Sequence, residues 1–130
     1  MSDFCVGRFL ESGIWYTDSG HRGPLKSVIQ IHVEGDDLIF DYEDGSRHTA
    51  AGAKSGLGHF TLSGQGVTGL CYLATQTLTL EYTANIDGQV ETNLDVWTFT
   101  DSHITRSGLI RQPERLIWFE AMMTRQVATD

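Results

Sequence analysis

Glu120 is the residue best suited to a chemical role, because it lies in a largely apolar run near the end of the chain. In the strand register derived below, its carboxyl group shares a face with Trp118 and Met122 and lies close to Ser107. Apolar surroundings disfavour the charged form of a carboxyl group and raise its pKa. Glu120 is therefore a candidate ligand contact or, in an enzyme, a general acid or base. A structural glutamate hydrogen-bonded to Ser107 is the alternative.

Two tyrosines fall on the same predicted face as Glu120, among aliphatic residues. A few polar groups on an apolar wall are typical of a ligand cavity, although a packed core also accommodates tyrosines. The candidate ligand-binding residues are Trp118, Glu120, Tyr82, Tyr42, Ser107, Phe60, Leu80 and Met122.

Other chemistries find little support in the residue spacing. The five histidines are scattered without the close pairing that metal sites need, so neither a metal nor a cofactor is expected. The segment 64–69 reads Gly-x-Gly-x-x-Gly, but a strand and not a helix is predicted to follow it, which argues against dinucleotide binding.

Composition limits the possible partners and the location. The chain has 130 residues, which suits a single domain over 1–130, and a formal net charge of −8. It has no run of basic residues, so nucleic acid and anionic membranes are not expected as partners. The first ten residues contain no signal-like apolar run, and the two cysteines, Cys5 and Cys71, are far apart, which together favour the cytoplasm.

Short runs rich in β-branched and aromatic residues alternate with glycine-containing turns along the whole chain. This pattern predicts an all-β protein with about ten strands and short connections. The predicted strands are 11–17, 25–33, 38–43, 46–50, 58–63, 67–73, 76–84, 89–99, 103–110 and 115–125.

Turn chemistry predicts how these strands pair. A hairpin centred on 34–37 sets Val33 opposite Leu38, and turns at 101–102 and 113–114 set Val96 opposite Ser107 and Ser107 opposite Glu120. The segment 85–88, Asn-Ile-Asp-Gly, is interpreted as a type I turn with a glycine bulge, which places Leu80 near Leu94.

These registers predict an up-and-down antiparallel β-barrel of about 8–10 strands, because closure removes the exposed edges of a long meander. One continuous face then points inward: Phe60, Leu62, Val67, Cys71, Leu78, Leu80, Tyr82, Leu94, Val96, Leu109, Trp118 and Met122. The opposite face of the C-terminal strands is also apolar and is expected to form a homodimer interface through Trp97, Phe99, Ile104, Ile117, Phe119 and Met123. A register slip by one residue would exchange the two faces.

The segment 12–16, Ser-Gly-Ile-Trp-Tyr, contains Gly-x-Trp at the start of a predicted strand. This resembles the signature of the lipocalins and their calycin relatives, including the fatty-acid-binding and nitrobindin-like barrels. The resemblance implies that Trp15 closes the barrel floor and that Arg125, from the last strand, packs across it. The short chain lacks an evident disulfide pair, so it is most similar to short intracellular members.

The predicted function is binding of a small apolar or aromatic ligand inside the barrel. One alternative is an isomerase, cyclase or lyase acting on a hydrophobic metabolite, with Glu120 as acid or base. A second alternative is a protein-interaction module without a ligand cavity, which would use the outer apolar patch.

Overall fold

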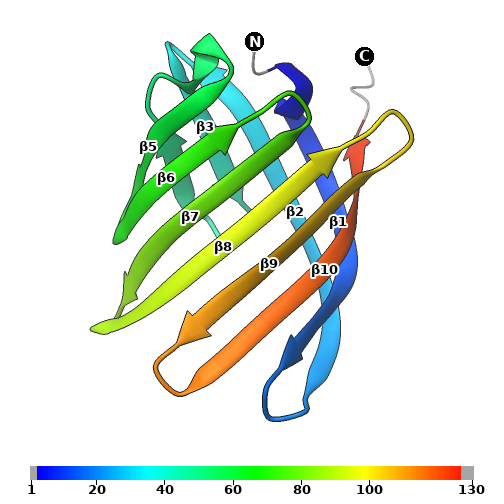
Figure 1. Ribbon diagram of the computed structural model, residues 1–130, viewed down its shortest axis with the longest axis vertical. Coiled ribbons are helices and arrows are strands. Elements are labelled where there is room, and N and C mark those ends of the chain that lie inside the picture. The colour runs from blue at the N-terminus through cyan, green and yellow to red at the C-terminus, as the bar shows by residue number, and fades with distance from the viewer. Residues whose placement is uncertain (1–2, 127–130) are drawn as a thin grey trace.

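The computed structural model describes residues 3–126 as ten strands and two short 3-10 segments (Figure 1). The strands are β1 (Gly7–Thr17), β2 (Arg22–Glu34), β3 (Asp37–Tyr42), β4 (Arg47–Ala50), β5 (Gly58–Gly64), β6 (Val67–Leu73), β7 (Thr77–Ile86), β8 (Gln89–Phe99), β9 (Ile104–Gln112) and β10 (Arg115–Gln126). The 3-10 segments are η1 (Asp3–Cys5) and η2 (Ala53–Ser55).

Each strand pairs antiparallel with the next one along the chain, and β10 pairs with β1 to close the barrel. The predicted all-β, up-and-down antiparallel barrel is therefore confirmed. Every predicted strand overlaps an observed one, although β1 begins at Gly7 rather than at 11 because 7–10 also pair with β2 and, from Arg8 onward, with β10.

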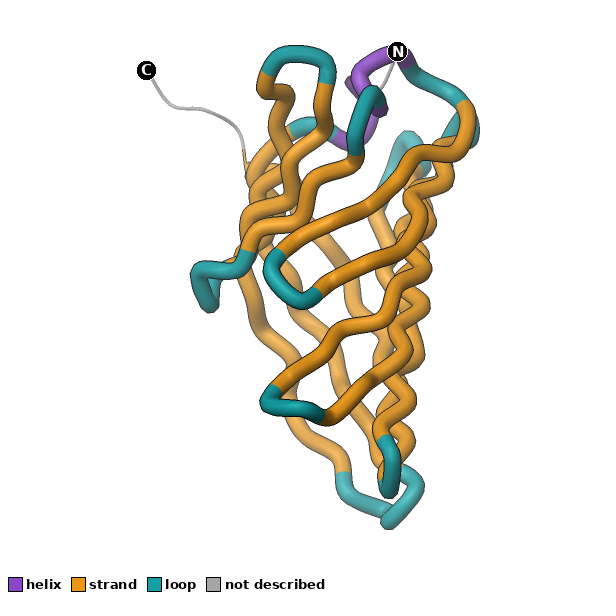
Figure 2. The backbone as a smooth tube through the Cα atoms, turned by 90° about the vertical axis from the view of Figure 1, so that its left-hand side faces the viewer, coloured by secondary structure: helices purple, strands orange, loops and turns teal. Residues whose placement is uncertain are grey.

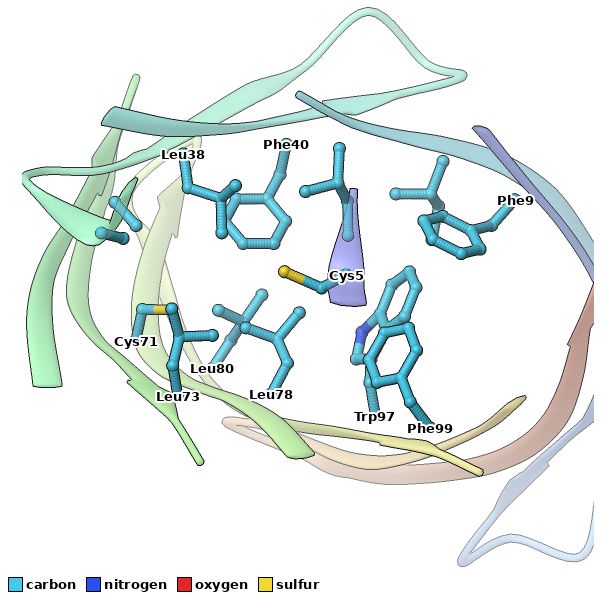
Figure 3. Close-up of a cluster of buried hydrophobic side chains, with 14 of the residues drawn as sticks. Cys5, Phe9, Leu38, Phe40, Cys71, Leu73, Leu78, Leu80, Trp97 and Phe99 are labelled. Atoms are coloured by element: carbon cyan, nitrogen blue, oxygen red, sulfur yellow. The ribbon is translucent and has the colours of Figure 1, made fainter. Parts of the chain in front are cut away.

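One end of the barrel is filled by side chains. Both 3-10 segments lie at this end (Figure 2). Cys5 of η1 lies near the centre of the ring of strands and is surrounded by apolar side chains (Figure 3). We call this region the packed half; its buried residues include Phe9, Ile29, Ile31, Leu38, Phe40, Leu62, Cys71, Leu73, Leu78, Leu80, Trp97, Phe99, Ile104 and Met123.

The turn between β7 and β8 differs from the predicted bulge and decides which face of three strands points inward. Asp87 and Gly88 form a two-residue turn in which both have positive φ, 52° and 83°. These values are typical of a type I′ turn, the commonest two-residue hairpin connection. Ile86 therefore pairs with Gln89, and Leu80 lies opposite Asp95 rather than near Leu94.

This one-residue difference turns β8, β9 and β10 over, because side chains alternate between faces. The predicted registers of the two following hairpins are confirmed: Val96 lies opposite Ser107, and Ser107 lies opposite Glu120. Because these two registers match the prediction, the faces of β9 and β10 are exchanged together with those of β8. The predicted inward positions of Leu94, Val96, Leu109, Trp118 and Met122 are therefore wrong, and the alternative of exchanged faces holds for these strands.

Candidate functional site in the open end of the barrel

Two adjoining compartments open at the end of the barrel opposite η1. The larger has a volume of about 890 Å³ and is bordered by the β3–β4, β5–β6 and β7–β8 turns. The smaller has a volume of about 370 Å³ and is lined mainly by apolar side chains. Arg106 and Ile110 line both, so we treat the two as one site, the open half. Its polar compartment includes Tyr42, His48, Val67, Tyr82, Ala84 and Asn93, and its apolar compartment includes Trp15, Thr17, Leu25, Ile117 and Phe119.

Arg106 of β9 is the central charge of the open half. Its side chain is 13% exposed and binds two buried carboxylates. Nε donates to Asp95 Oδ1 at 2.9 Å and Nη2 donates to Asp95 Oδ2 at 2.7 Å, while Nη1 donates to Glu11 Oε2 at 2.7 Å. Burial by itself would lower the pKa of Arg106, but Asp95 and Glu11 outweigh it and raise that pKa above its usual value. Arg106 is therefore a permanent cation.

Two aromatic rings hold the Arg106 guanidinium in place. Its central carbon lies 4.8 Å from the ring centroid of Phe119 and 5.6 Å from that of Trp97. Both distances suit a cation on an aromatic face. Trp97 pairs with Arg106 across β8 and β9, so this contact lies inside the barrel.

His48 lies between two tyrosines in the polar compartment. Its ring centroid is 4.9 Å from that of Tyr42 and 5.1 Å from that of Tyr82. Burial, with the nearby charge of Asp95, raises the pKa of Tyr42 well above its usual value and that of Tyr82 to about 12. Burial lowers the pKa of His48 and opposes the influence of Asp44 and Asp95. All three rings are therefore uncharged at neutral pH.

Several buried polar atoms in the described part of the chain, residues 3–126, have no hydrogen-bond partner. Three belong to residues that line the polar compartment: Tyr42 Oη, His48 Nδ1 and Asn93 Nδ2. The other two are Glu11 Oε1 and Trp97 Nε1. Leaving such a group unpaired costs about 1–3 kcal/mol. The polar compartment therefore favours a molecule that supplies hydrogen-bond partners.

Glycines opposite two inward aromatic residues shape the apolar compartment. Trp15 pairs with Gly23, and a Cβ atom at Gly23 would lie 2.5 Å from Trp15 Cζ2. Phe119 pairs with Gly108, where a Cβ atom would lie 2.4 Å from Phe119 Cζ. Each ring lies against the backbone of the neighbouring strand, which leaves room in the barrel.

The predicted ligand-binding residues divide into three groups. Tyr42 and Tyr82 line the polar compartment. Leu80 is fully buried in the packed half, and Phe60 packs against it. The remaining four lie on the outer face and are exposed: Trp118, Glu120, Ser107 and Met122.

The predicted interior position of Glu120 is wrong. Its Oε1 atom accepts a 3.4 Å hydrogen bond from Tyr16, and the Tyr16 ring stacks on Trp118 with centroids 5.9 Å apart. All three side chains lie on the outer surface, and for Trp118 and Glu120 this follows from the β7–β8 turn. Glu120 is exposed, so the burial that would have made it an acid or base is absent from its position.

The predicted outer patch is also wrong, for the same reason. Trp97, Phe99, Ile104 and Met123 are buried in the packed half, and Ile117 and Phe119 line the apolar compartment. These six residues face the barrel interior and cannot form an interface between two copies of the chain.

Trp15 on β1 and Arg125 on β10 do not meet, because they lie at opposite ends of the β1–β10 pair. Trp15 pairs with Phe119, whereas Arg125 pairs with Phe9. The guanidinium carbon of Arg125 lies 5.2 Å from the Phe9 ring centroid, and its Nη2 donates to the carbonyl oxygen of Phe4. Arg125 thus packs over an aromatic residue and binds η1, while Trp15 lines the open half.

Sequence reasoning missed the residues that define the open half. Each charged residue of the cluster lies two positions from a large apolar residue: Glu11 from Phe9, Asp95 from Trp97 and Arg106 from Ile104. Asp87-Gly88 is a strong signal for a two-residue hairpin. Reading that turn as type I′ would have placed Asp95 and Arg106 inside. The same alternation of inward and outward residues places His48 and Asn93 inside the barrel.

Comparison with protein-family models, curated proteins and solved structures gives no match to this chain. Among residues 3–126, no helix has the length and apolar character to cross a membrane. No group of three or more metal-ligating side chains gathers within the same residues. The function is therefore inferred from the geometry of the open half.

Proposed function

We propose that this chain binds a small molecule in the open half of its barrel. The observation that carries the proposal is the set of unpartnered buried atoms on the polar compartment: Tyr42 Oη, His48 Nδ1 and Asn93 Nδ2. Their residues come from three different strands and line one cavity. A bound molecule that hydrogen-bonds to them removes the cost of burying them unpaired.

The size and lining of the site suit this function. Ligand cavities usually measure about 300–1,000 Å³ and combine an apolar wall with a few oriented polar groups. The polar and apolar compartments share Arg106 and Ile110. A molecule with a hydrogen-bonding end and an apolar end would place the first against Asn93 and His48 and the second against Trp15 and Phe119.

This proposal modifies the ligand class expected from the sequence. The most apolar part of the interior is filled by Trp97, Phe99 and their neighbours, so it offers no room for a wholly apolar ligand. The space lies instead in the open half, where Arg106 borders both compartments. The ligand is therefore proposed to be partly polar.

The resemblance to lipocalin-like barrels supports the proposal only through Gly13-Ile14-Trp15, because Arg125 lies at the other end. The enzyme alternative depended on Glu120, which is exposed and hydrogen-bonded to Tyr16. Binding of a small molecule is therefore better supported than catalysis.

Native mass spectrometry of freshly purified protein tests the proposal. Cargo carried through purification appears as a mass excess over the denatured chain. The Ala84→Phe variant fills the polar compartment, because Ala84 is buried on its wall. The Thr83→Phe variant adds the same ring on the outer face of β7 and is the matched control.

We expect cargo on the wild type and on Thr83→Phe, and its loss from Ala84→Phe. The same three proteins are then screened with a fluorescent amphiphilic probe. The proposal fails if the wild type carries no cargo and binds no probe, or if Ala84→Phe binds as well as the control.

A further inference from the structure

The hydrogen-bonding capacity of Arg106 is only partly used within the protein. An arginine side chain has five N–H groups in a fixed plane. Three of them donate to Asp95 and Glu11 among the described residues. Two N–H groups remain on a side chain that lines both compartments. They are donors that require an acceptor atom.

The charge around these donors is negative in sum. Glu11 and Asp95 carry two negative charges and Arg106 one positive charge, which gives a formal charge of −1 for the buried cluster. The rim of the polar compartment adds Asp44, Asp87 and Glu91 against Arg47. This excess of negative charge would repel a ligand carboxylate or phosphate. The repulsion would be strong because the site is partly dehydrated.

A cationic ligand is also disfavoured at the polar wall. The guanidinium of Arg106 repels an ammonium group, and the Nδ2 amide of Asn93 offers donors rather than acceptors. The carboxylates of Asp95 and Glu11 already bind Arg106. The neutral rings of Tyr42 and His48 add no charge of either sign to the polar wall.

We propose that the ligand presents an uncharged polar edge with both an acceptor and a donor, as in a carboxamide or lactam. Its carbonyl oxygen accepts from Arg106 and Asn93, and its N–H donates to Nδ1 of His48. Tyr42 Oη serves either role. This inference rests on the proposed function and specifies the ligand class for the same site.

Three probes that share one ring system test the choice of charge: naphthalene-2-carboxamide, 2-naphthoate and 2-naphthylmethylammonium. Dissociation constants are measured for the wild type by isothermal titration calorimetry at pH 7.5 in about 0.15 M salt. We expect the carboxamide to bind at least about tenfold more tightly than either ion, a difference of about 1.4 kcal/mol.

The inference is overturned if either ion binds as tightly as the carboxamide, or if none of the three binds. Neither result decides the proposed function, which the cargo of the wild type and of Ala84→Phe tests separately. A cargo whose mass corresponds to an organic acid or amine would likewise overturn the inference while leaving the binding function in place.

The Glu11→Gln variant isolates the role of the buried charge. It keeps an oxygen acceptor for Arg106 Nη1 and changes the formal charge of the cluster from −1 to zero. We expect 2-naphthoate to gain about tenfold in affinity, while the carboxamide changes by less than about twofold. Glu81→Gln removes an equal charge from the exposed face of β7 and is expected to leave both unchanged. An unaltered naphthoate affinity in folded Glu11→Gln would contradict the inference.

Discussion

Arg106 on β9 and Asp95 on β8 form a bidentate ion pair inside the barrel, with Nε–Oδ1 and Nη2–Oδ2 distances of 2.9 and 2.7 Å. The pair lies where the packed half meets the open half, since Arg106 lies over Trp97 on one side and lines both compartments on the other. This position makes the pair both a structural element and a wall of the proposed ligand site.

Removing Arg106 should destabilise the fold strongly. Arg106→Met leaves Asp95 and Glu11 buried without their cation, which costs about 3–5 kcal/mol. Arg47→Met removes ion pairs with Asp41 and Glu34 on the surface, which should cost far less because water screens exposed charges. Urea unfolding followed by circular dichroism compares the two. Equal losses of stability would show that the buried pair lacks the role assigned to it.

The β7–β8 turn should depend on Gly88. Gly88→Ala forces a side chain into the left-handed region at φ 83°, which costs about 1–2 kcal/mol. Asp87→Asn keeps a residue that tolerates positive φ and should change the unfolding free energy by less than about 0.5 kcal/mol. Chemical denaturation of both variants checks this. A neutral Gly88→Ala would mean that the turn is not type I′.

His48 should make stability fall in mild acid. Because burial lowers its pKa in the folded state, the unfolded chain binds more protons below the usual His pKa of 6.5. The unfolding free energy therefore decreases as the pH falls from 6.5 towards the lowered pKa, by at most about 1.4 kcal/mol per pH unit. Thermal melts between pH 7.5 and 5 measure the slope.

The His48→Phe variant should flatten this slope, whereas His59→Gln, which removes an exposed imidazole, should not. An unchanged slope in His48→Phe would assign the acid sensitivity to other groups. The same protonation should weaken binding of the carboxamide probe, since a charged His48 loses its acceptor nitrogen.

Three of the four tyrosines have a raised pKa, and the two that line the polar compartment should ionise last in alkali. Burial raises the pKa of Tyr82 to about 12 and raises that of Tyr42 well above its usual value. A raised tyrosine pKa contributes stability below the unfolded value of 10, and that stability is lost as the pH rises towards 12. Absorbance at 295 nm should show the late phase, which Tyr82→Phe should reduce. Ionisation of all four tyrosines near pH 10 in folded protein would contradict their burial.

The barrel could be predicted from the sequence because its signals are local. Alternating apolar residues mark the strands, and glycine or aspartate marks the turns. The β2–β3 register was predicted correctly from the 34–37 turn, which aligns Val33 with Leu38. Closure followed from the number of strands.

The candidate site could not be predicted because its residues come together only with the observed β7–β8 turn and only after β10 pairs with β1 to close the barrel. With Asp87-Gly88 taken as part of a longer loop, Glu120 points inward and Asp95 points outward, and the apolar content of both faces fits either choice. Glu11 and Arg106 are 95 positions apart and meet only because β10 joins β1 to β9. No pattern in the sequence places that pair before the ring is closed.

The three tryptophans provide the most direct measurement of where a ligand binds. Trp15 lies in the apolar compartment, Trp97 in the packed half and Trp118 on the outer surface. Their indole N–H signals are recorded in a ¹H–¹⁵N NMR titration with naphthalene-2-carboxamide and assigned by single Trp→Phe variants. Ligand binding in the open half should shift the Trp15 signal most and leave Trp118 unchanged. A shift of Trp118 with Trp15 unchanged would place binding on the outer surface and contradict the account.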